Sequence, residues 1–395
     1  MIDKRDVGIY VHIPFCVRKC RYCDFLSAPG NDDVVREYVS ALISDIENAE
    51  GADNYNVRTV YFGGGTPSSV RHEYIAAVMR ALCGRFGLKP QKDGDGNATL
   101  FDRDGRRLDE CTIEVNPGTV TEERLKAYRE MGFDRISVGV QSADDEELKM
   151  LGRIHTFSDA KECVRSARNA GFKNLSVDII SALPGQSIEK YRENLEKTVA
   201  LEPDHISSYS LIIEEGTPFF DMYGPQGEQR SELPDEETDR KMYALTKEVL
   251  KSHGYERYEI SNYARSGYES RHNTSYWTGR EYYGFGLGAA SFLGNKRLSV
   301  LRDLKEYAAH PSARVQEEEL DRRDLMNEFM MLGLRLTKGV SRAEFERRFG
   351  VSMDEAFPGV LSRLLSQGLI EENAGYVRLT EFGTDVANTV FGEFV

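Results

Sequence analysis

The feature that most constrains this fold is a regular alternation of strand and helix patterns through the first half of the chain. Strands are predicted at residues 8–13, 57–62, 111–115, 135–140, 175–180 and 205–211, and helices at 33–49, 74–86, 121–131, 158–170 and 188–201. Alternation of this kind implies parallel strands joined by right-handed crossovers. An open doubly wound sheet and a closed or partial barrel both fit, and the periodicity alone does not choose between them.

Two segments depart from this alternation. Residues 87–110 form an insertion in which a β-hairpin is predicted over 99–108; its aspartates lack the downstream Glu of a calcium loop, so we interpret it as surface. After residue 211 the pattern changes, and residues 326–395 show three helices, a strand–turn–strand and a last helix, an order typical of a winged-helix-like module. We therefore expect a core over 1–222 that contains insertion 87–110, a connector over 223–325 and a C-terminal domain over 326–395.

Composition excludes several function classes. The 395 residues carry a net charge of -14, which argues against a nucleic-acid partner because such proteins show a basic stripe. No apolar run approaches the roughly 18–20 residues that a membrane span requires, and the N-terminus has no signal-peptide pattern. Three scattered cysteines, Cys83, Cys111 and Cys163, are expected to be buried thiols. The sequence predicts a cytoplasmic protein that reaches a membrane only through a partner.

The three remaining cysteines form a cluster. Cys16, Cys20 and Cys23 follow the first strand in the spacing C-x3-C-x2-C, which suits soft metals. A structural zinc site needs a fourth ligand, and C-x-x-C redox chemistry uses only two cysteines. Apart from coincidence, the best fit is an iron–sulfur cube held by three thiolates, which leaves one iron open to a substrate or cofactor.

Other polar or flexible residues stand where predicted strands end. The second strand runs into the glycine-rich YFGGGTPS, where backbone groups can approach a ligand closely. Further polar residues at strand ends, or shortly after them, are Glu114, Gln141, Arg153 and Asp178. Because the carboxyl ends of parallel strands share one edge, these groups are expected beside the cysteines. Such a mixture of charges suits a zwitterionic ligand with ribose hydroxyls.

These motifs together resemble the radical S-adenosylmethionine (radical SAM) superfamily, and more closely its oxygen-independent coproporphyrinogen III oxidase-like group. Matching stretches run almost end to end and include IHIPFC, YFGGGTPS, EVNPGT, ISVGVQS, LGRIH, HISSYSL, YEISNYA, GFGLGAAS and NEFMMLGLR. The insertion 87–110 is the main stretch outside the resemblance. The implied fold is α/β: a partial (β/α)6, TIM-like radical SAM barrel with a mixed, partly winged-helix-like C-terminal domain over its open side.

The resemblance also implies cofactors and their ligands. A [4Fe-4S] cluster on Cys16, Cys20 and Cys23 would be chelated by the amino and carboxylate groups of SAM, and the reduced cluster would cleave SAM to a 5′-deoxyadenosyl radical. By the family pattern, the SAM contacts are Tyr10, Gly64, Gly65, Thr66, Glu114, Gln141, Arg153 and Asp178, with Ala290 a weaker candidate.

Departures from the oxidase pattern favour a haem-chaperone branch of the group. Phe25 stands where the oxidase has a further cysteine, the oxidase's longer N-terminal region is missing, and HNTSYW, residues 272–277, matches that branch. The implied function is haem binding and delivery to an unidentified apo-protein acceptor. A porphyrinogen oxidase and a radical SAM enzyme acting on an unrelated substrate remain as alternatives, so turnover is left open.

Three of the seven histidines can be interpreted, one as a candidate ligand and two as structural residues. His272 is a candidate haem ligand, although it could instead anchor a loop through hydrogen bonds. Trp277 could stack on a porphyrin or pack in a core. His12 and His205 are interpreted as structural residues of the barrel.

Overall fold

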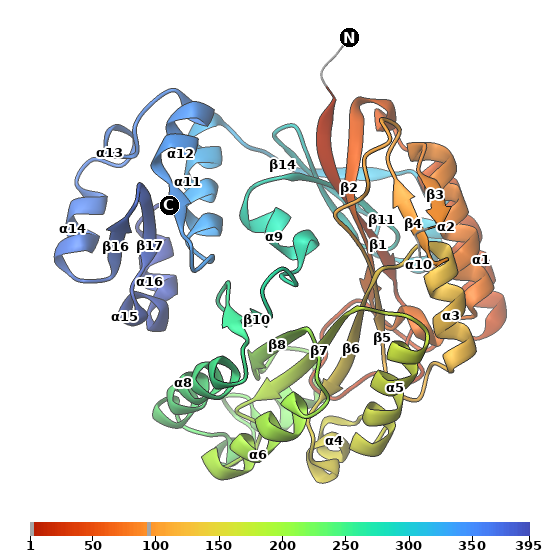
Figure 1. Cartoon of the computed structure of the whole chain (residues 1–395), viewed down its shortest axis with the longest axis horizontal. Helices are drawn as coiled ribbons and strands as arrows, with labels where there is room; N and C mark the ends of the chain where they lie inside the picture. Colours follow the sequence, from red (N-terminus) through yellow and green to blue (C-terminus); the bar gives the residue numbers. More distant parts are fainter. Residues whose placement is uncertain (1–3, 93–95) are drawn as a thin grey trace.

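The computed structural model describes residues 4–92 and 96–395, and its centre is one large curved sheet (Figure 1). Six of its strands pair in parallel in chain order: β1 (Arg5–Ile13), β2 (Tyr55–Gly64), β5 (Glu110–Val115), β6 (Arg135–Gln141), β7 (Asn174–Ser181) and β8 (His205–Ser210). The predicted partial (β/α)6 barrel is therefore confirmed.

The connector extends this sheet at both edges. β11 (Glu281–Phe285) pairs in parallel with β1, and the antiparallel strands β12 (Ala290–Leu293), β13 (Lys296–Val300) and β14 (Arg314–Glu319) continue beyond it. On the other side, β10 (Asn262–Ala264) pairs with β8 and then with β9 (Glu256–Arg257). β9 is only two residues long.

Helices cover the convex face of the sheet (Figure 1). They are α1 (Asp32–Glu47), α2 (His72–Phe86), α3 (Glu122–Met131), α5 (Phe157–Asn169), α6 (Ile188–Val199) and α8 (Glu236–Ser252), and the first five lie close to the predicted bounds. Local signals set their ends: the Thr121 side chain accepts from Arg124 N at the start of α3, and Gly132 closes that helix in the left-handed region. The sequence did not predict α4 (Asp145–Leu151), a short helix capped by Asp144.

The strands of the barrel place apolar residues outward and polar residues inward. Ile136, Val138 and Val140 of β6 belong to the core under the helices, whereas the intervening Ser137 donates to Asp178 Oδ1 of β7 at 3.3 Å. Successive side chains of a strand point to opposite faces. The lumen is therefore polar and able to hold a polar ligand.

The insertion differs from its prediction. β4 (Ala98–Phe101) pairs backward with β3 (Lys89–Lys92), and only a single bridge, Phe101 to Arg107, joins it to the sequence that follows. The hairpin predicted over 99–108 is confirmed only as a short antiparallel turn, in which Leu108 N donates to Leu100 O at 3.0 Å, and residues 106–108 form no strand of their own. The physical reason is that the Asp102 carboxylate accepts from Asp104 N at 3.0 Å and Arg106 N at 2.8 Å, which closes a tight loop in place of a second strand.

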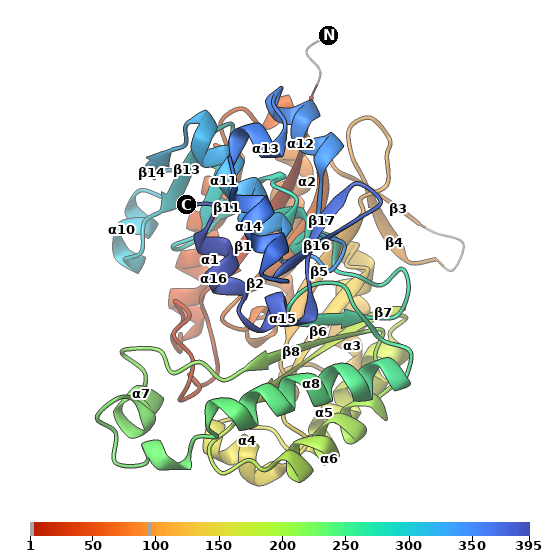
Figure 2. The same cartoon turned by 90° about the vertical axis from the view of Figure 1, so that its left-hand side faces the viewer.

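The C-terminal region has a core of its own and lies over the open side of the barrel (Figure 2). Its helices are α11 (Arg322–Gly333), α12 (Arg342–Phe349), α13 (Met353–Ala356), α14 (Val360–Ser366), α15 (Glu381–Asp385) and α16 (Ala387–Gly392). Its sheet has the order β15 (Val340–Ser341), β17 (Tyr376–Leu379), β16 (Ile370–Asn373). This is the mixed, winged-helix-like arrangement that was predicted.

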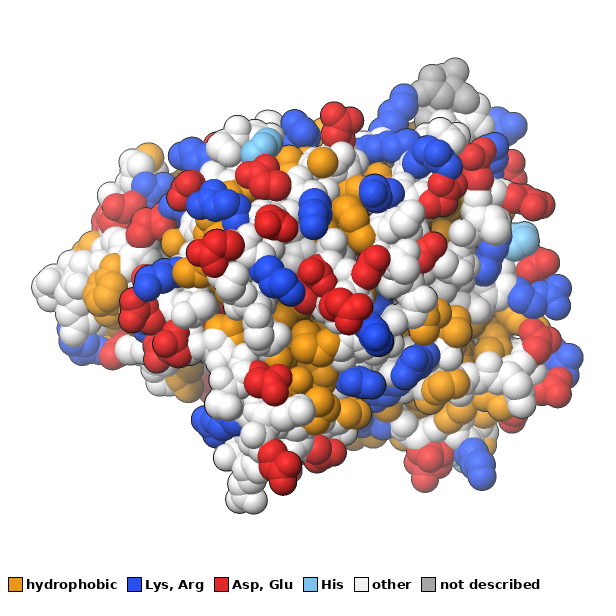
Figure 3. Space-filling model, turned by 90° about the horizontal axis from the view of Figure 1, so that it is seen from below, with side chains coloured by type: hydrophobic (Ala, Val, Ile, Leu, Met, Phe, Trp, Pro, Cys, Tyr) orange, Lys and Arg blue, Asp and Glu red, His pale blue; other side chains and the backbone are white. Residues whose placement is uncertain are grey.

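Three short helices complete the chain: α7 (Pro218–Tyr223), α9 (Arg271–Trp277) and α10 (Leu304–Ala309). Within residues 4–92 and 96–395, no helix is both long and apolar enough to cross a membrane. The face seen from below intersperses basic and acidic side chains among hydrophobic patches (Figure 3).

Candidate active site

The loop that carries the three cysteines is fixed by backbone hydrogen bonds. Cys16 N donates to Ala28 O at 3.2 Å, and Arg21 N donates to Leu151 O, the last residue of α4, at 3.0 Å. All three thiols are free and half-buried. The first bond closes the loop on itself and the second ties it to α4, so the thiols are held at the carboxyl end of the strands.

The three thiols border a cavity of about 140 Å³ at this end of the barrel. The lining also includes most of the residues predicted to contact SAM, namely Gly64, Gly65, Thr66, Glu114, Gln141, Arg153 and Asp178. Tyr10 lies beside this cavity without lining it, and its hydroxyl contacts His12 Nδ1 at 3.0 Å. Ala290 is an exposed residue of β12 and does not line the cavity.

A chain of hydrogen bonds connects two of the cysteines across this cavity. Thr66 Oγ1 donates to Cys16 Sγ at 3.5 Å and accepts from Asn116 Nδ2 at 2.7 Å. Asn116 Oδ1 accepts from Arg153 Nη2 at 2.6 Å, and Arg153 Nη1 donates to Cys20 Sγ at 3.5 Å. The sequence analysis missed Asn116, although it follows β5 just as the predicted residues follow their strands.

The glycines of the YFGGGTPS loop are required by close packing. A Cβ on Gly65 would lie 2.7 Å from the carbonyl oxygen of Phe15, and Gly64 has φ of 110° with His12 ring atoms 2.5 Å from its Cβ position. Only glycine fits such a combination of backbone angle and contact. Gly65 N also donates to Ile13 O at 2.9 Å, so this loop supports the cysteine loop directly.

Two carboxylates lie in the lumen next to the cavity. Glu114 accepts from Tyr61 OH at 2.7 Å and from Gly64 N at 3.2 Å. The pKa of Glu114 is raised to about 7. Burial is the largest cause and the charge of Asp178 adds to it, while the hydrogen bonds from Tyr61 and Gly64 oppose the rise. Burial likewise raises the pKa of Asp178, opposed by hydrogen bonds from Ser207 and Ser137. Both groups would gain from a ligand that donates hydrogen bonds.

Gln141 has a strained backbone at the end of β6. Its φ is 69°, in the left-handed region that residues other than glycine seldom adopt, and the pairing of β6 with β7 shifts register there. Strain of this kind gathers at functional sites, and here it directs the Gln141 side chain to the cavity.

A second cavity of about 350 Å³ continues from the first into the lumen, and the two share Glu114, Gln141 and Asp178. It is also lined by Phe25, Tyr209, Ile212, Arg135, Ser207 and Asn273. Asn273 belongs to HNTSYW, so this motif reaches the interior of the barrel.

His272 is fully enclosed beneath this cavity. Its Nδ1 contacts Thr59 Oγ1 at 2.8 Å, its Nε2 contacts Tyr276 OH at 2.8 Å, and its ring stacks on Tyr61. Burial, together with Arg135, lowers the pKa of His272 to about 3. Ligation of haem iron by His272 would therefore first require one of these hydrogen bonds to break.

The two histidines interpreted as structural also have buried partners. His205 is completely buried, with Nδ1 2.8 Å from Ser176 Oγ and Nε2 2.8 Å from Tyr258 OH. His12 Nε2 contacts Leu26 O at 2.9 Å, which adds a support for the cysteine loop.

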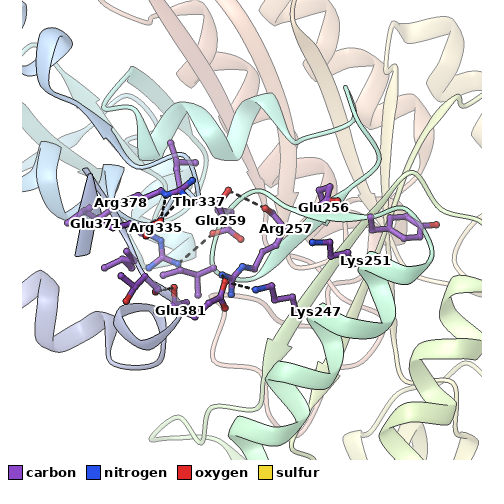
Figure 4. A pocket seen from close by; sticks show the side chains of 17 residues that line it. Lys247, Lys251, Glu256, Arg257, Glu259, Arg335, Thr337, Glu371, Arg378 and Glu381 are labelled. Atoms are coloured by element: carbon purple, nitrogen blue, oxygen red, sulfur yellow. Dashed lines mark hydrogen bonds and ion pairs between the residues drawn. The ribbon is translucent and has the colours of Figure 1, made fainter. Parts of the chain in front are cut away.

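A third cavity of about 310 Å³ separates the barrel from the C-terminal domain (Figure 4). Lys247 pairs with Glu381 of α15, and Arg257 Nη2 lies 3.5 Å from the same carboxylate. Arg335 extends toward Glu259 and covers the ring of Trp277 at 4.3 Å. Trp277 is therefore packed at this junction, and none of the three cysteines lines it.

The residues of the first cavity fit an iron–sulfur cluster. In the described part of the chain, no three His, Cys, Asp or Glu side chains converge on a single metal ion; the three thiols instead border a shared space. Arg18, Lys19 and Arg153 line the same cavity. Burial raises the pKa of Cys23, and the charge of Lys19 opposes that rise. A donor set of sulfurs with an adjoining polar pocket suits a cluster that also binds a small molecule.

Family comparisons agree with this fold and site. Residues 10–198 match the radical SAM superfamily, and residues 320–386 match the HemN C-terminal domain. The architecture is that of a radical SAM protein, a class whose cofactors are a [4Fe-4S] cluster and SAM.

Comparison with individual proteins identifies the family within this superfamily. The chain is 35% identical to heme chaperone HemW of Bacillus subtilis over 391 residues, 98% of each chain, and 32% identical to heme chaperone HemW of Escherichia coli over the full length of both. The chain belongs to the HemW family. The coproporphyrinogen III oxidase HemN of Escherichia coli shares the fold, with a TM-score of 0.80 over 99% of this chain and 90% of that one at 22% identity.

Proposed function

We propose that this protein is a haem chaperone: it binds haem, delivers it to an apo-protein acceptor, and carries a [4Fe-4S] cluster and SAM in its barrel. The observation that carries the proposal is the cavity in which three thiols and seven residues expected to contact SAM come together. The full-length similarity to proteins named heme chaperone HemW supports the haem part.

In this proposal Cys16, Cys20 and Cys23 hold the cluster, and the cluster with SAM supplies one-electron chemistry when both are bound. Arg153, which reaches Cys20 and Asn116, would bind the SAM carboxylate. Glu114 and Asp178 would accept hydrogen bonds from the amino group and the ribose. Gly64, Gly65 and Thr66 would offer backbone groups.

Phe25 supports the chaperone over the oxidase. It is 63% exposed at the edge of both ligand cavities, where a cysteine would place a reactive thiol. An apolar side chain at this place suits contact with an apolar ligand more than chemistry on it.

The first experiment tests the cluster. After anaerobic reconstitution, we expect four irons per chain and a visible absorption band in the wild type, and loss of both in Cys16→Ala, Cys20→Ala and Cys23→Ala. Cys83→Ala is the matched control, because Cys83 is a half-buried thiol outside the lining of this cavity. Full cluster content in any of the three variants would contradict the assignment.

The second experiment tests the function. The reconstituted protein is given SAM and reductant, then either haemin or coproporphyrinogen III, and a haem-free acceptor is added to the haemin sample. We expect tight haemin binding, transfer to the acceptor and no porphyrinogen conversion. Formation of protoporphyrinogen would instead establish the oxidase, the runner-up function.

A further inference from the structure

Arg135 lies at the floor of the 350 Å³ cavity without a dedicated partner. It begins β6, its side chain is only 2% exposed, and it is among the residues that line this space. Its nearest carboxylate is Glu110, at 3.9 Å from Nε. Within residues 4–92 and 96–395, no acceptor lies within hydrogen-bond distance of that Nε. A buried guanidinium with unmet donors is costly unless a ligand supplies the acceptors.

Glu110 is already committed to other donors. It accepts from Arg271 N at 2.7 Å, from Ser270 Oγ at 3.3 Å and from Thr112 Oγ1 at 2.9 Å. This carboxylate therefore holds the start of α9 in the barrel, and it neutralises Arg135 only at a distance.

Four carboxylates line the cavity, Asp24, Glu114, Asp178 and Glu214, and the two in the lumen, Glu114 and Asp178, are engaged elsewhere. Glu114 accepts from Tyr61 OH and Gly64 N, and Asp178 accepts from Ser137 Oγ at 3.3 Å. Neither lies within 4 Å of a nitrogen of Arg135 among the ion pairs of the described residues. The charge of Arg135 lowers the pKa of both carboxylates through space, but its Nε donor remains open to the cavity.

The opposite end of the cavity is apolar and open. Phe25 and Ile212 are 63% and 67% exposed at the mouth, and Tyr209 is 43% exposed beside them. Exposed large apolar side chains gathered on a cavity mark a binding surface. The ligand that matches this space is apolar along most of its length and anionic at the end that enters first.

We propose that Arg135, with Asn273 of the same cavity, binds a carboxylate of the ligand, while Phe25, Tyr209 and Ile212 contact its apolar body. This inference rests on the proposed function: the ligand is haem, and the carboxylate is one of its propionates. Haem enters the cavity edge-first, with the propionate at the floor and the macrocycle at the mouth. A guanidinium suits such a group because it donates two parallel hydrogen bonds. HNTSYW then contributes Asn273 to the floor, and its histidine supports the floor from below.

The first experiment compares two ligands on the wild-type protein. The reconstituted, SAM-loaded protein is titrated with haemin and with haemin dimethyl ester, whose propionates cannot ionise, and the Soret band reports binding. We expect haemin to bind roughly tenfold or more tightly than the ester, the range of a charge-assisted hydrogen bond. Equal affinities would overturn the inference and leave the proposed function intact, whereas no binding of either compound would overturn both.

The second experiment uses variants to test which residue binds the carboxylate. In Arg135→Gln we expect haemin and its ester to bind with affinities within about threefold of each other. Arg129→Gln is the control: Arg129, on α3, is also buried, but it donates to Phe133 O just after that helix. The Arg129→Gln variant should therefore keep the preference for haemin. A folded Arg135→Gln that keeps the wild-type preference would overturn the inference. If that variant does not fold, Asn273→Ala takes its place, with a reduced preference expected and an unchanged one contradicting the proposal.

Discussion

Arg153 donates to Asn116 Oδ1 at 2.6 Å, and the same guanidinium reaches Cys20 Sγ at 3.5 Å. Asn116 in turn donates to Thr66, which reaches Cys16. The amide thus holds a cation and a hydroxyl in place on either side of the thiols. Removing it would free both side chains without removing any expected ligand.

We expect Asn116→Ala to weaken SAM binding about tenfold or more, because Arg153 would lose the acceptor that orients it. The measurement is SAM affinity at a cluster content determined separately by iron analysis. Asn169→Ala is the control, since Asn169 is exposed and donates to Glu122 on α3. Unchanged SAM affinity in Asn116→Ala would show that Arg153 needs no such support.

Glu114 should make stability depend on pH. Its pKa is about 7 in the folded chain against 4.5 for an ordinary glutamate. Between these values the folded state keeps a proton that the unfolded state releases, so stability is fully present below this window and falls as the pH rises through it. Relative to Glu114→Gln, the SAM-free wild type should lose on the order of 2 kcal/mol of unfolding free energy between pH 5.5 and 8.

Denaturant titrations of both proteins across this pH range measure the effect. Glu123→Gln serves as the control because Glu123 is exposed on α3, and its curve should follow the wild type. Parallel curves for Glu114→Gln and the wild type would exclude the raised pKa.

His272→Ala is expected to destabilise the protein by about 2–3 kcal/mol, because a buried ring, its stacking and two hydrogen bonds are lost together. Thermal unfolding measures the loss of stability, and the Soret spectrum of the haemin complex reports haem ligation. His310→Ala, at an exposed residue, is the control. The opposite pattern, unchanged stability with loss of the haem-ligand spectrum, would identify His272 as the haem ligand.

Glu381 joins the C-terminal domain to the barrel through Lys247 and Arg257 (Figure 4). We expect Glu381→Gln to increase hydrogen exchange in α15 and the end of α8, while global stability changes by less than about 1 kcal/mol because the carboxylate is exposed. Glu371→Gln breaks a pair with Arg378 inside the same domain and should leave the exchange at α8 unchanged. Equal exchange in both variants would mean that Glu381 does not hold the domains together.

The strand and helix pattern predicted the barrel because the apolar and polar residues within each element indicate which of its faces is buried. In β6, Ile136 and Val138 face helices, and Ser137 between them faces the lumen. The glycine loop and the strand-end residues could be placed on one edge by the same rule. The environment of His272 could not be predicted, because its partner Thr59 is 213 positions away. Asn116 escaped notice because an asparagine before proline is equally typical of a turn.

The pairing of β11 with β1 and of β10 with β8 has a practical consequence. Both outer strands of the six-stranded series are covered by segments that come after residue 222. A chain truncated there would expose two rows of unpaired backbone groups along its apolar-faced strands, and such bare edges template aggregation between molecules. The first half of this protein should therefore be recovered as insoluble material when it is produced alone, and co-expression of the second half should rescue it.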